Sequence, residues 1–383
     1  MEHEIPDFSP SARLKAGHSL KDEYVRIKKL KEQGETPNLI EIDILARFEN
    51  QDLNKLTKLE RDLMDQCSAE ENYEIGCLYE GINYDYGDPN FPIALLFYEK
   101  AATKDHIVAQ KTLGRIYQNG RGVKRDYKKA FKWNSKAAEQ GDEFAQFILA
   151  WAYANGEGVE KDDKKAVKWY TKSAEQDNDV AQNNLGYMYE DGRGVKKDYK
   201  KAVKWYTKAT ELGYELAQNN LGEMYENGRG VKKDYKKAVK WYTKAAEQGS
   251  DRAQNNLGVI YANGLGVSQD DKESVKWYSK AANQNYAWAQ FSLALAYAYG
   301  KGIEKDDKEA VKWYSKAAKQ GYNRAQNNLG VMYANGRGVT KDDKEAVKWY
   351  LKAAEQDNLR AQCNLGHRYS ICLLYTSPSP RDS

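Results

Sequence analysis

AQNNLGYMYEDGRGVKKDYKKAVKWYTKA, the stretch at residues 181–209, has near copies along most of the 383-residue chain. Its opening Ala-Gln pair returns every 36 residues, and seven unbroken repeats fill residues 109–360. The alanines that mark the repeat starts are Ala109, Ala145, Ala181, Ala217, Ala253, Ala289, Ala325 and Ala361. A constant period of this length without insertions predicts a stack of similar units, not a series of separate globular domains.

Each repeat predicts two helices joined by a tight turn. Ala181, Leu185 and Tyr189 lie four residues apart, so they share one face of a first helix, named helix A. The next segment, 191–195, contains two glycines that can adopt positive φ angles and end this helix. Asp198 then stands where an N-cap is needed, and the apolar residues after it form one face of a second helix, named helix B. The expected fold class is all-α, built from 36-residue helix-turn-helix repeats.

Both ends of helix B carry further signals. In three repeats a glutamate follows the N-cap aspartate by three residues, which predicts a reciprocal capping box. The pairs are Asp270 with Glu273, Asp306 with Glu309, and Asp342 with Glu345. At its C-terminal end helix B meets Gly, Asp or Asn in every repeat, and these residues best tolerate a left-handed backbone.

The repeat pattern also divides the chain into segments. Residues 70–108 form a degenerate first repeat whose turn is two residues longer. Before it we expect a helical N-terminal extension at 1–69, partly mobile and interrupted by prolines. The seven full repeats fill 109–360, and residues 361–371 start a truncated further repeat.

The last segment, 372–383, departs from the pattern abruptly. The register predicts glycine at 372 and 374, but the sequence is CLLYTSPSPRDS. This string resembles the translation of an adapter used in sequencing libraries, so we interpret it as an assembly artefact outside the fold. A genuine tail rich in proline and serine is the alternative.

The composition argues against several classes of function. The 60 Lys and Arg residues stand against 56 Asp and Glu, so no chain-wide positive charge favours a polyanion. The four cysteines and four histidines show no spacing typical of a metal site, and motifs of hydrolases and nucleotide-binding loops are missing. We expect a protein that is not an enzyme and has no cofactor and no metal. The acidic start, MEHEIPD, and the lack of a long apolar stretch predict a cytoplasmic location without a membrane span.

The stretch at 181–209 resembles the Sel1-like repeat, a relative of the tetratricopeptide repeat. The similarity covers residues 109–371 and is specific, because seven consecutive repeats match the pattern. It implies a right-handed α/α solenoid, or superhelix, whose concave helix-A face binds other proteins. It also implies a scaffold or adaptor without catalysis, whose partner is a protein or peptide that the resemblance does not identify.

Candidate binding residues lie on helix A, opposite the face that packs. If each marker alanine is position 0, positions 2, 6 and 9 should be exposed. Asparagine at position 2 can pair with an extended peptide backbone, and apolar pairs at positions 2 and 6 can anchor a partner side chain. The candidates are Asn183, Asn219, Asn255 and Asn327 for the backbone, Phe147 with Trp151 and Phe291 with Leu295 for the anchors, and Tyr187 at position 6.

Structural explanations compete with both sets of candidates. The asparagines can simply belong to the repeat consensus. The two repeats with apolar pairs replace the helix-A glycine by Ala150 and Ala294, so their helices can pack in a shifted way. These repeats lie 144 residues apart, which indicates duplication of a four-repeat block.

Two other functions stay open. The lysine-rich helix-B faces, above all 196–208 and 232–244, are an alternative site for anions or nucleic acid, although a solvated helix face explains them and nucleic acid is not favoured. The periodic tryptophans beside these lysines are interpreted as core residues. Alternatively, the repeats are the targeting arm of an enzyme whose catalytic domain is missing beyond residue 371.

Overall fold

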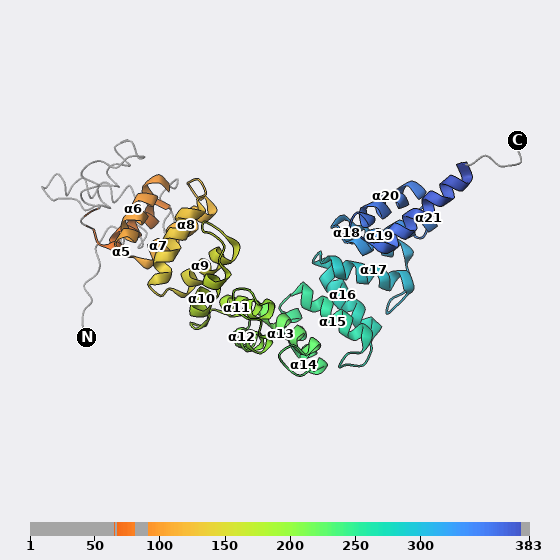
Figure 1. The fold of residues 1–383 in the computed structure, drawn as a ribbon, viewed down its shortest axis with the longest axis horizontal. Coiled ribbons are helices and arrows are strands. Elements are labelled where there is room, and N and C mark those ends of the chain that lie inside the picture. The colour runs from red at the N-terminus through yellow and green to blue at the C-terminus, as the bar shows by residue number, and fades with distance from the viewer. Residues whose placement is uncertain (1–64, 66, 81–90, 377–383) are drawn as a thin grey trace, which may run out of the picture. The chain divides into compact units, whose positions relative to one another are not determined.

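The computed structural model describes residues 65, 67–80 and 91–376, and this part of the chain is helical without any strand (Figure 1). Its 17 helices fall into two compact units, which span residues 1–197 and 198–383. The N-terminal extension expected at 1–69 lies almost wholly outside the described residues, as does the end of the tail at 377–383.

Odd-numbered helices are the helix-A elements and even-numbered helices are the helix-B elements. The first unit contains Ala69–Glu80 (α5), Phe91–Thr103 (α6), Ile107–Asn119 (α7), Tyr127–Glu139 (α8), Glu143–Asn155 (α9), Asp163–Ala174 (α10) and Asp179–Asp191 (α11). The second unit contains Tyr199–Glu211 (α12), Glu215–Asn227 (α13), Tyr235–Glu247 (α14), Asp251–Asn263 (α15), Asp271–Asn283 (α16), Ala287–Tyr299 (α17), Asp307–Lys319 (α18), Asn323–Asn335 (α19), Asp343–Ala354 (α20) and Leu359–Thr376 (α21). Within each unit, consecutive helices pack against one another, which confirms the predicted α/α solenoid.

The turn between helix A and helix B needs both of its glycines. The first ends helix A in the left-handed conformation, with φ 77° at Gly192 and 65° at Gly336. The second also has a positive φ and touches the start of helix B in the preceding repeat. A Cβ atom on Gly338 would lie 2.1 Å from the backbone oxygen of Asp307, so a larger residue cannot enter. The turn is therefore also a contact between repeats.

The caps of helix B agree with the sequence except at the capping boxes. The side chain of Asp270 accepts a hydrogen bond from the backbone N–H of Glu273 at 2.9 Å, as expected. The reciprocal bond is not formed within the described structure, because the N–H of Asp270 already donates to the backbone oxygen of Tyr261 at 3.0 Å. The glutamate pairs instead with the lysine one turn later. The three pairs are Glu273 with Lys276, Glu309 with Lys312, and Glu345 with Lys348.

Two aromatic positions of helix B contribute to the core. Tyrosine at position 25 lies against the helix-A glycine at position 5, and a Cβ atom on Gly258 would lie 2.5 Å from the ring of Tyr278. The glycine in mid-helix is therefore explained by the ring that it admits. Tryptophan at position 24 is buried or half-buried, and a lysine lies over its ring: Lys280 Nζ is 3.9 Å from the ring centroid of Trp277. This packing agrees with a core role for the tryptophans.

Glutamines join consecutive repeats within each unit. Gln254, which follows a marker alanine, donates to the backbone oxygen of Ala246 in the preceding helix B at 3.2 Å. Its own side-chain oxygen accepts a hydrogen bond from Gln284 at 2.8 Å. Equivalent pairs, named the glutamine ladder, are Gln110 with Gln140, Gln146 with Gln176, Gln218 with Gln248, Gln290 with Gln320, and Gln326 with Gln356. The Ala-Gln pair recurs because its glutamine satisfies polar groups buried between helices.

Candidate functional site

The four predicted asparagines lie inside the stack, so the exposure expected for position 2 is wrong. They are 2–7 % exposed: Asn183, Asn219, Asn255 and Asn327. Asn219 donates to Glu223 Oε1 at 2.9 Å and accepts from Asn256 of the next repeat at 3.1 Å. Asn327 accepts in the same way from Asn364 at 3.0 Å. In these two repeats the next A helix covers position 2, and the asparagine joins consecutive repeats.

The phenylalanines of the two predicted anchors also take part in packing. Phe291 is 6 % exposed, and its ring centroid lies 5.2 Å from that of Tyr322 and 5.9 Å from that of Tyr314. Phe147 is half-buried, with its ring 6.1 Å from that of Tyr170. Neither ring is a free anchor for a partner.

The two repeats with alanine at position 5 also differ in the hydrogen-bond partner of their helix-B tyrosine. Where position 5 is glycine, as in the repeat of Tyr242, the tyrosine hydroxyl donates to Glu226 at 2.6 Å within the same repeat. In the two repeats with alanine, the hydroxyl instead accepts from an asparagine of the next repeat: Asn184 lies 3.4 Å from Tyr170 and Asn328 lies 3.2 Å from Tyr314. The structure thus favours the shifted packing that competed with the anchor hypothesis.

The other predicted residues reach the surface to different degrees. Trp151 and Tyr187, both at position 6, are 42 % and 45 % exposed, and Leu295 is half-buried. The sequence analysis missed the residue before each marker alanine, position −1, where Phe144 is 50 % and Trp288 is 54 % exposed. Positions −1 and 6 are seven residues apart, so they form one ridge of helix A. The variability of position −1 between repeats was the signal that could have revealed it.

A cleft of about 330 Å³ crosses three A helices of the first unit. Its lining, which defines the helix-A cleft, consists of Tyr73 on α5, Val108, Lys111, Thr112, Arg115 and Gln118 on α7, Asn134 on α8, and Phe144 and Ile148 on α9. Ligand pockets in proteins measure about 300–1,000 Å³, so this cleft can take one or two side chains of a partner.

Part of this space exists because Asn134 is smaller than the residue at the same position in the other repeats. It stands at position 25, and the other described helix-B elements carry tyrosine there: Tyr98, Tyr170, Tyr206, Tyr242, Tyr278, Tyr314 and Tyr350. Asn134 is 6 % exposed and packs on Gly114, whose added Cβ would lie 2.3 Å from its Oδ1 atom. Its amide has no hydrogen-bond partner in the described part of the chain, although it lines the cleft. A repeat alignment shows the exception, but only the structure shows the cleft beside it.

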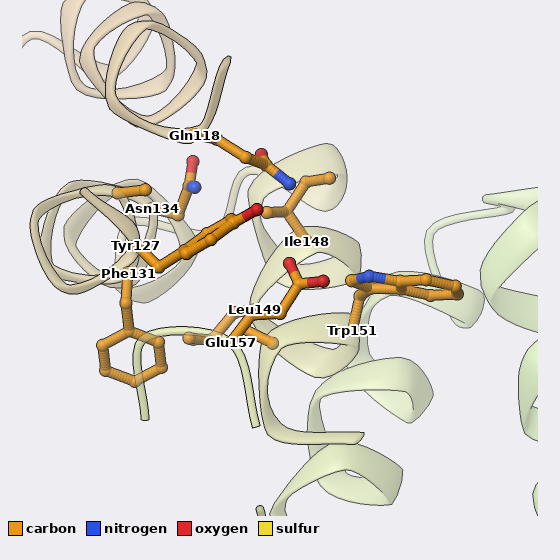
Figure 2. A pocket seen from close by; sticks show the side chains of 10 residues that line it. Gln118, Tyr127, Phe131, Asn134, Ile148, Leu149, Trp151 and Glu157 are labelled. Atoms are coloured by element: carbon orange, nitrogen blue, oxygen red, sulfur yellow. The ribbon is translucent and has the colours of Figure 1, made fainter. Parts of the chain in front are cut away.

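Figure 2 shows the other side of Asn134, where little space is left. The hollow there measures about 10 Å³, and its lining includes four large side chains: Tyr127, Phe131, Ile148 and Trp151. Such a hollow holds no more than a water molecule. The Gln118 and Tyr127 side chains extend toward Ile148, while the rings of Phe131 and Trp151 point to opposite sides (Figure 2). The usable space of the first unit therefore lies in the helix-A cleft.

The helix-A cleft has a positively charged edge. Lys111 pairs with Asp142 at 2.8 Å, whereas exposed Arg115 has no ion pair with any described residue. Tyr73 also lines the cleft, and burial raises the pKa of its phenol to about 12. The cleft thus offers apolar walls, unpaired amides and one unpaired cation.

The second unit has a cleft of about 270 Å³ between α16 and α17, named the unit-2 cleft. It is lined by Ala262, Asp271, Ser274, Val275, Tyr278, Ser292, Leu295, Ala296, Tyr299 and Lys301. Leu295, predicted as an anchor, therefore lies in a cleft wall, and Tyr299 at its edge is 66 % exposed.

Other kinds of site have little support among the described residues. The described residues contain no group of three His, Cys, Asp or Glu side chains that could hold a metal ion. No helix among them is both long and apolar enough to cross a membrane. In the lysine-rich segments, Lys208 and Lys244 lie over the rings of Trp205 and Trp241. Anion binding by these helix-B faces stays a prediction.

Comparison with known proteins agrees with the repeat architecture. The Sel1 repeat family model matches residues 72–106, 107–142, 144–178, 179–214, 216–250, 251–286, 289–322 and 323–358. The structure is similar to a Sel1 repeat protein from Oxalobacter formigenes, with 34 % identity, a TM-score of 0.68, and coverage of 80 % of this chain and 89 % of that chain. It is also similar to c5321, a protective antigen of uropathogenic Escherichia coli strains with an SLR fold, at 33 % identity and a TM-score of 0.58, over 91 % of this chain and 83 % of that chain. None of the curated proteins matches the chain significantly.

Proposed function

Because the chain belongs to the Sel1 repeat family, whose members generally act as non-catalytic protein-interaction scaffolds, we propose that it binds a peptide segment of a protein partner across the A helices of its first unit. The observation that carries this proposal is the helix-A cleft, whose lining comes from the three successive A helices α5, α7 and α9. An extended segment can cross parallel helices of this kind and place successive side chains on successive repeats. The adaptor role and the cytoplasmic location stay predictions.

The chemistry of the surface supports a peptide ligand. Phe144 and Val108 are 50 % and 43 % exposed on the cleft walls, and such side chains lose unfavourable contact with water when a partner covers them. Trp151 and Tyr187 continue the exposed ridge on α9 and α11, and aromatic side chains of this kind dominate many interfaces. The four asparagines are not part of the proposed surface, because they are buried between repeats.

A peptide library displayed on phage and selected on the immobilised full chain tests the proposal. We expect one family of peptides to be enriched. Its affinity should fall at least about tenfold with Phe144→Ala, which corresponds to about 1.4 kcal/mol. Leu351→Ala is the matched control, because Leu351 is an exposed apolar residue on α20 of the second unit. Enrichment that is equal on the two variants, or no enrichment on the unmodified chain, would contradict the proposal.

A further inference from the structure

We infer that the helix-A cleft recognises a tyrosine of the partner that stands next to an acidic residue. The phenol would occupy the space left where Asn134 replaces the tyrosine of the other repeats. This inference rests on the proposed function and specifies the chemistry of its ligand.

Other repeats hold an aromatic ring at the position of Asn134. Tyr98 and Tyr242 at position 25 are 0 % exposed, and each ring lies against a helix-A glycine. The repeat of Asn134 keeps this glycine, Gly114, although the ring is missing. The asparagine fills only the part next to Gly114, and beyond its amide the space opens into the cleft. A ring that enters from the partner would restore the packing that the other repeats make internally.

The polar groups of the vacancy match a phenol better than a phenyl ring. In two other repeats the tyrosine hydroxyl donates to a glutamate at position 9: Tyr98 to Glu80 and Tyr242 to Glu226, each at 2.6 Å. Here position 9 is Gln118, which lines the cleft beside Asn134. Neither of these two side-chain amides has a hydrogen-bond partner among the described residues. A phenol can donate to and accept from such amides, whereas a phenylalanine would leave them desolvated and unpaired.

The charge at the cleft edge selects what stands next to the tyrosine. Arg115 is exposed and lacks an ion pair with the described residues. Lys111 forms an ion pair with Asp142. An aspartate or glutamate of the partner beside the tyrosine can pair with Arg115. A phosphate on the phenol oxygen would instead have to enter between two neutral amides, so phosphotyrosine should bind more weakly.

The test uses the same peptide selection on the full chain, followed by fluorescence polarisation with the enriched peptide. We expect enrichment of tyrosine beside aspartate or glutamate. Replacing that tyrosine in the peptide by phenylalanine should weaken binding about fivefold, by alanine about thirtyfold, and phosphorylation should also weaken it. Stronger binding of the phosphorylated peptide would overturn the inference, since the cleft would then recognise phosphate.

Variants of the protein locate the ligand. Asn134→Tyr should weaken binding at least about thirtyfold while the melting temperature stays equal or rises, because it restores the tyrosine of the other repeats. Arg115→Glu should weaken binding about tenfold, and Leu351→Ser, a matched surface control, should leave it unchanged. If Asn134→Tyr does not fold, Gln118→Leu is the variant to test. It should bind the tyrosine peptide and the phenylalanine peptide with equal affinity.

The outcomes separate this inference from the function on which it rests. Peptides without tyrosine that lose affinity with Phe144→Ala but not with Asn134→Tyr would overturn the inference and leave the proposed peptide binding in place. Equal affinity of a tyrosine peptide for Asn134→Tyr and for the unmodified chain would also overturn it. Failure of the unmodified chain to enrich any peptide would overturn both.

Discussion

Two corresponding sites, one in each unit, are lined by residues that lie 144 positions apart in the sequence. The side chains that line them differ in size. The site in the first unit is reduced to about 10 Å³, and the site in the second unit measures about 270 Å³. The large residues of the first unit, Tyr127, Phe131, Ile148 and Trp151, have the counterparts Asp271, Val275, Ser292 and Leu295. At position 25 the order is reversed, because Asn134 is small and Tyr278 is large.

The residues that fix the backbone of the repeat differ from the residues that shape its surface. Glycines, cap aspartates and the glutamine ladder are shared by both regions and fix the backbone. A few exchanges of side-chain size then accompany the different amounts of free space at this position. The surface of this fold can therefore differ between repeats while the backbone stays the same.

The largest effect is expected when the residue of the first unit is copied into the second. Tyr278→Asn removes a ring that is only 8 % exposed, and loss of a large buried side chain costs about 3–5 kcal/mol. Urea unfolding followed by circular dichroism measures the total cost. Hydrogen exchange of α16 and α17 shows whether the loss is local, because repeat arrays can unfold in parts.

Tyr278→Phe is the control for this variant. It keeps the ring and loses only the hydroxyl, so its cost should be about 1 kcal/mol. Equal destabilisation by the two variants would mean that the hydroxyl, and not the ring, stabilises this repeat, so that loss of a ring at Asn134 would leave no favourable site for a partner's ring.

Alkaline pH should act on both units in the same way. Burial raises the pKa of Tyr170 and of Tyr314, which lie 144 residues apart, from 10.0 to about 12. Because the folded pKa exceeds the unfolded one, the stabilisation is complete below pH 10 and is lost as the pH rises through about 12. A shift of this size corresponds to about 2–3 kcal/mol for each phenol. Unfolding free energies measured across this range should fall, and they should fall less in the double variant Tyr170→Phe with Tyr314→Phe.

A spectroscopic titration of the tyrosines in the folded protein can contradict this expectation. If the ultraviolet absorbance of the phenolates rises completely near pH 10 while the protein stays folded, the two phenols are not buried in solution as the structure has them.

A smaller and unequal effect is expected for alanine at position 5. Gly258→Ala places a Cβ atom 2.5 Å from the ring of Tyr278, and overpacking of this kind costs about 1–3 kcal/mol. The atoms nearest to a Cβ on Gly114 belong to the amide of Asn134, which can turn into the open cleft. Alanine also has a helix propensity about 1 kcal/mol better than glycine, so the net cost at 114 should be near zero. The melting temperatures of the two variants test this difference. An equal decrease in both would contradict an open cleft at Asn134.

The sequence allowed prediction of the features that depend on neighbours in the same repeat. The period, the two helices, the glycine turn and the cap at Asp198 all follow from local backbone chemistry, and the structure confirms them. The exposure of Asn219 was wrongly predicted, because one repeat does not show that the next A helix covers position 2. The cleft at Asn134 was missed for a related reason. The exchange is visible in the sequence, but its meaning depends on the contact between positions 5 and 25.

The smallest effect should be the same in both regions, because it concerns a contact that they share. Gln176→Leu and Gln284→Leu each remove the donor to a glutamine of the ladder, at 2.9 Å from Gln146 and 2.8 Å from Gln254. Each also removes a donor to a glycine backbone oxygen, at 3.0 Å from Gly141 and 2.9 Å from Gly249. The remaining side-chain oxygen is partly buried and loses its partner, which costs about 1–2 kcal/mol. Urea unfolding should give costs that agree within about 0.5 kcal/mol for the two variants. A clear difference would mean that the ladder depends on the cleft beside it, and backbone and surface would then not vary independently in this fold.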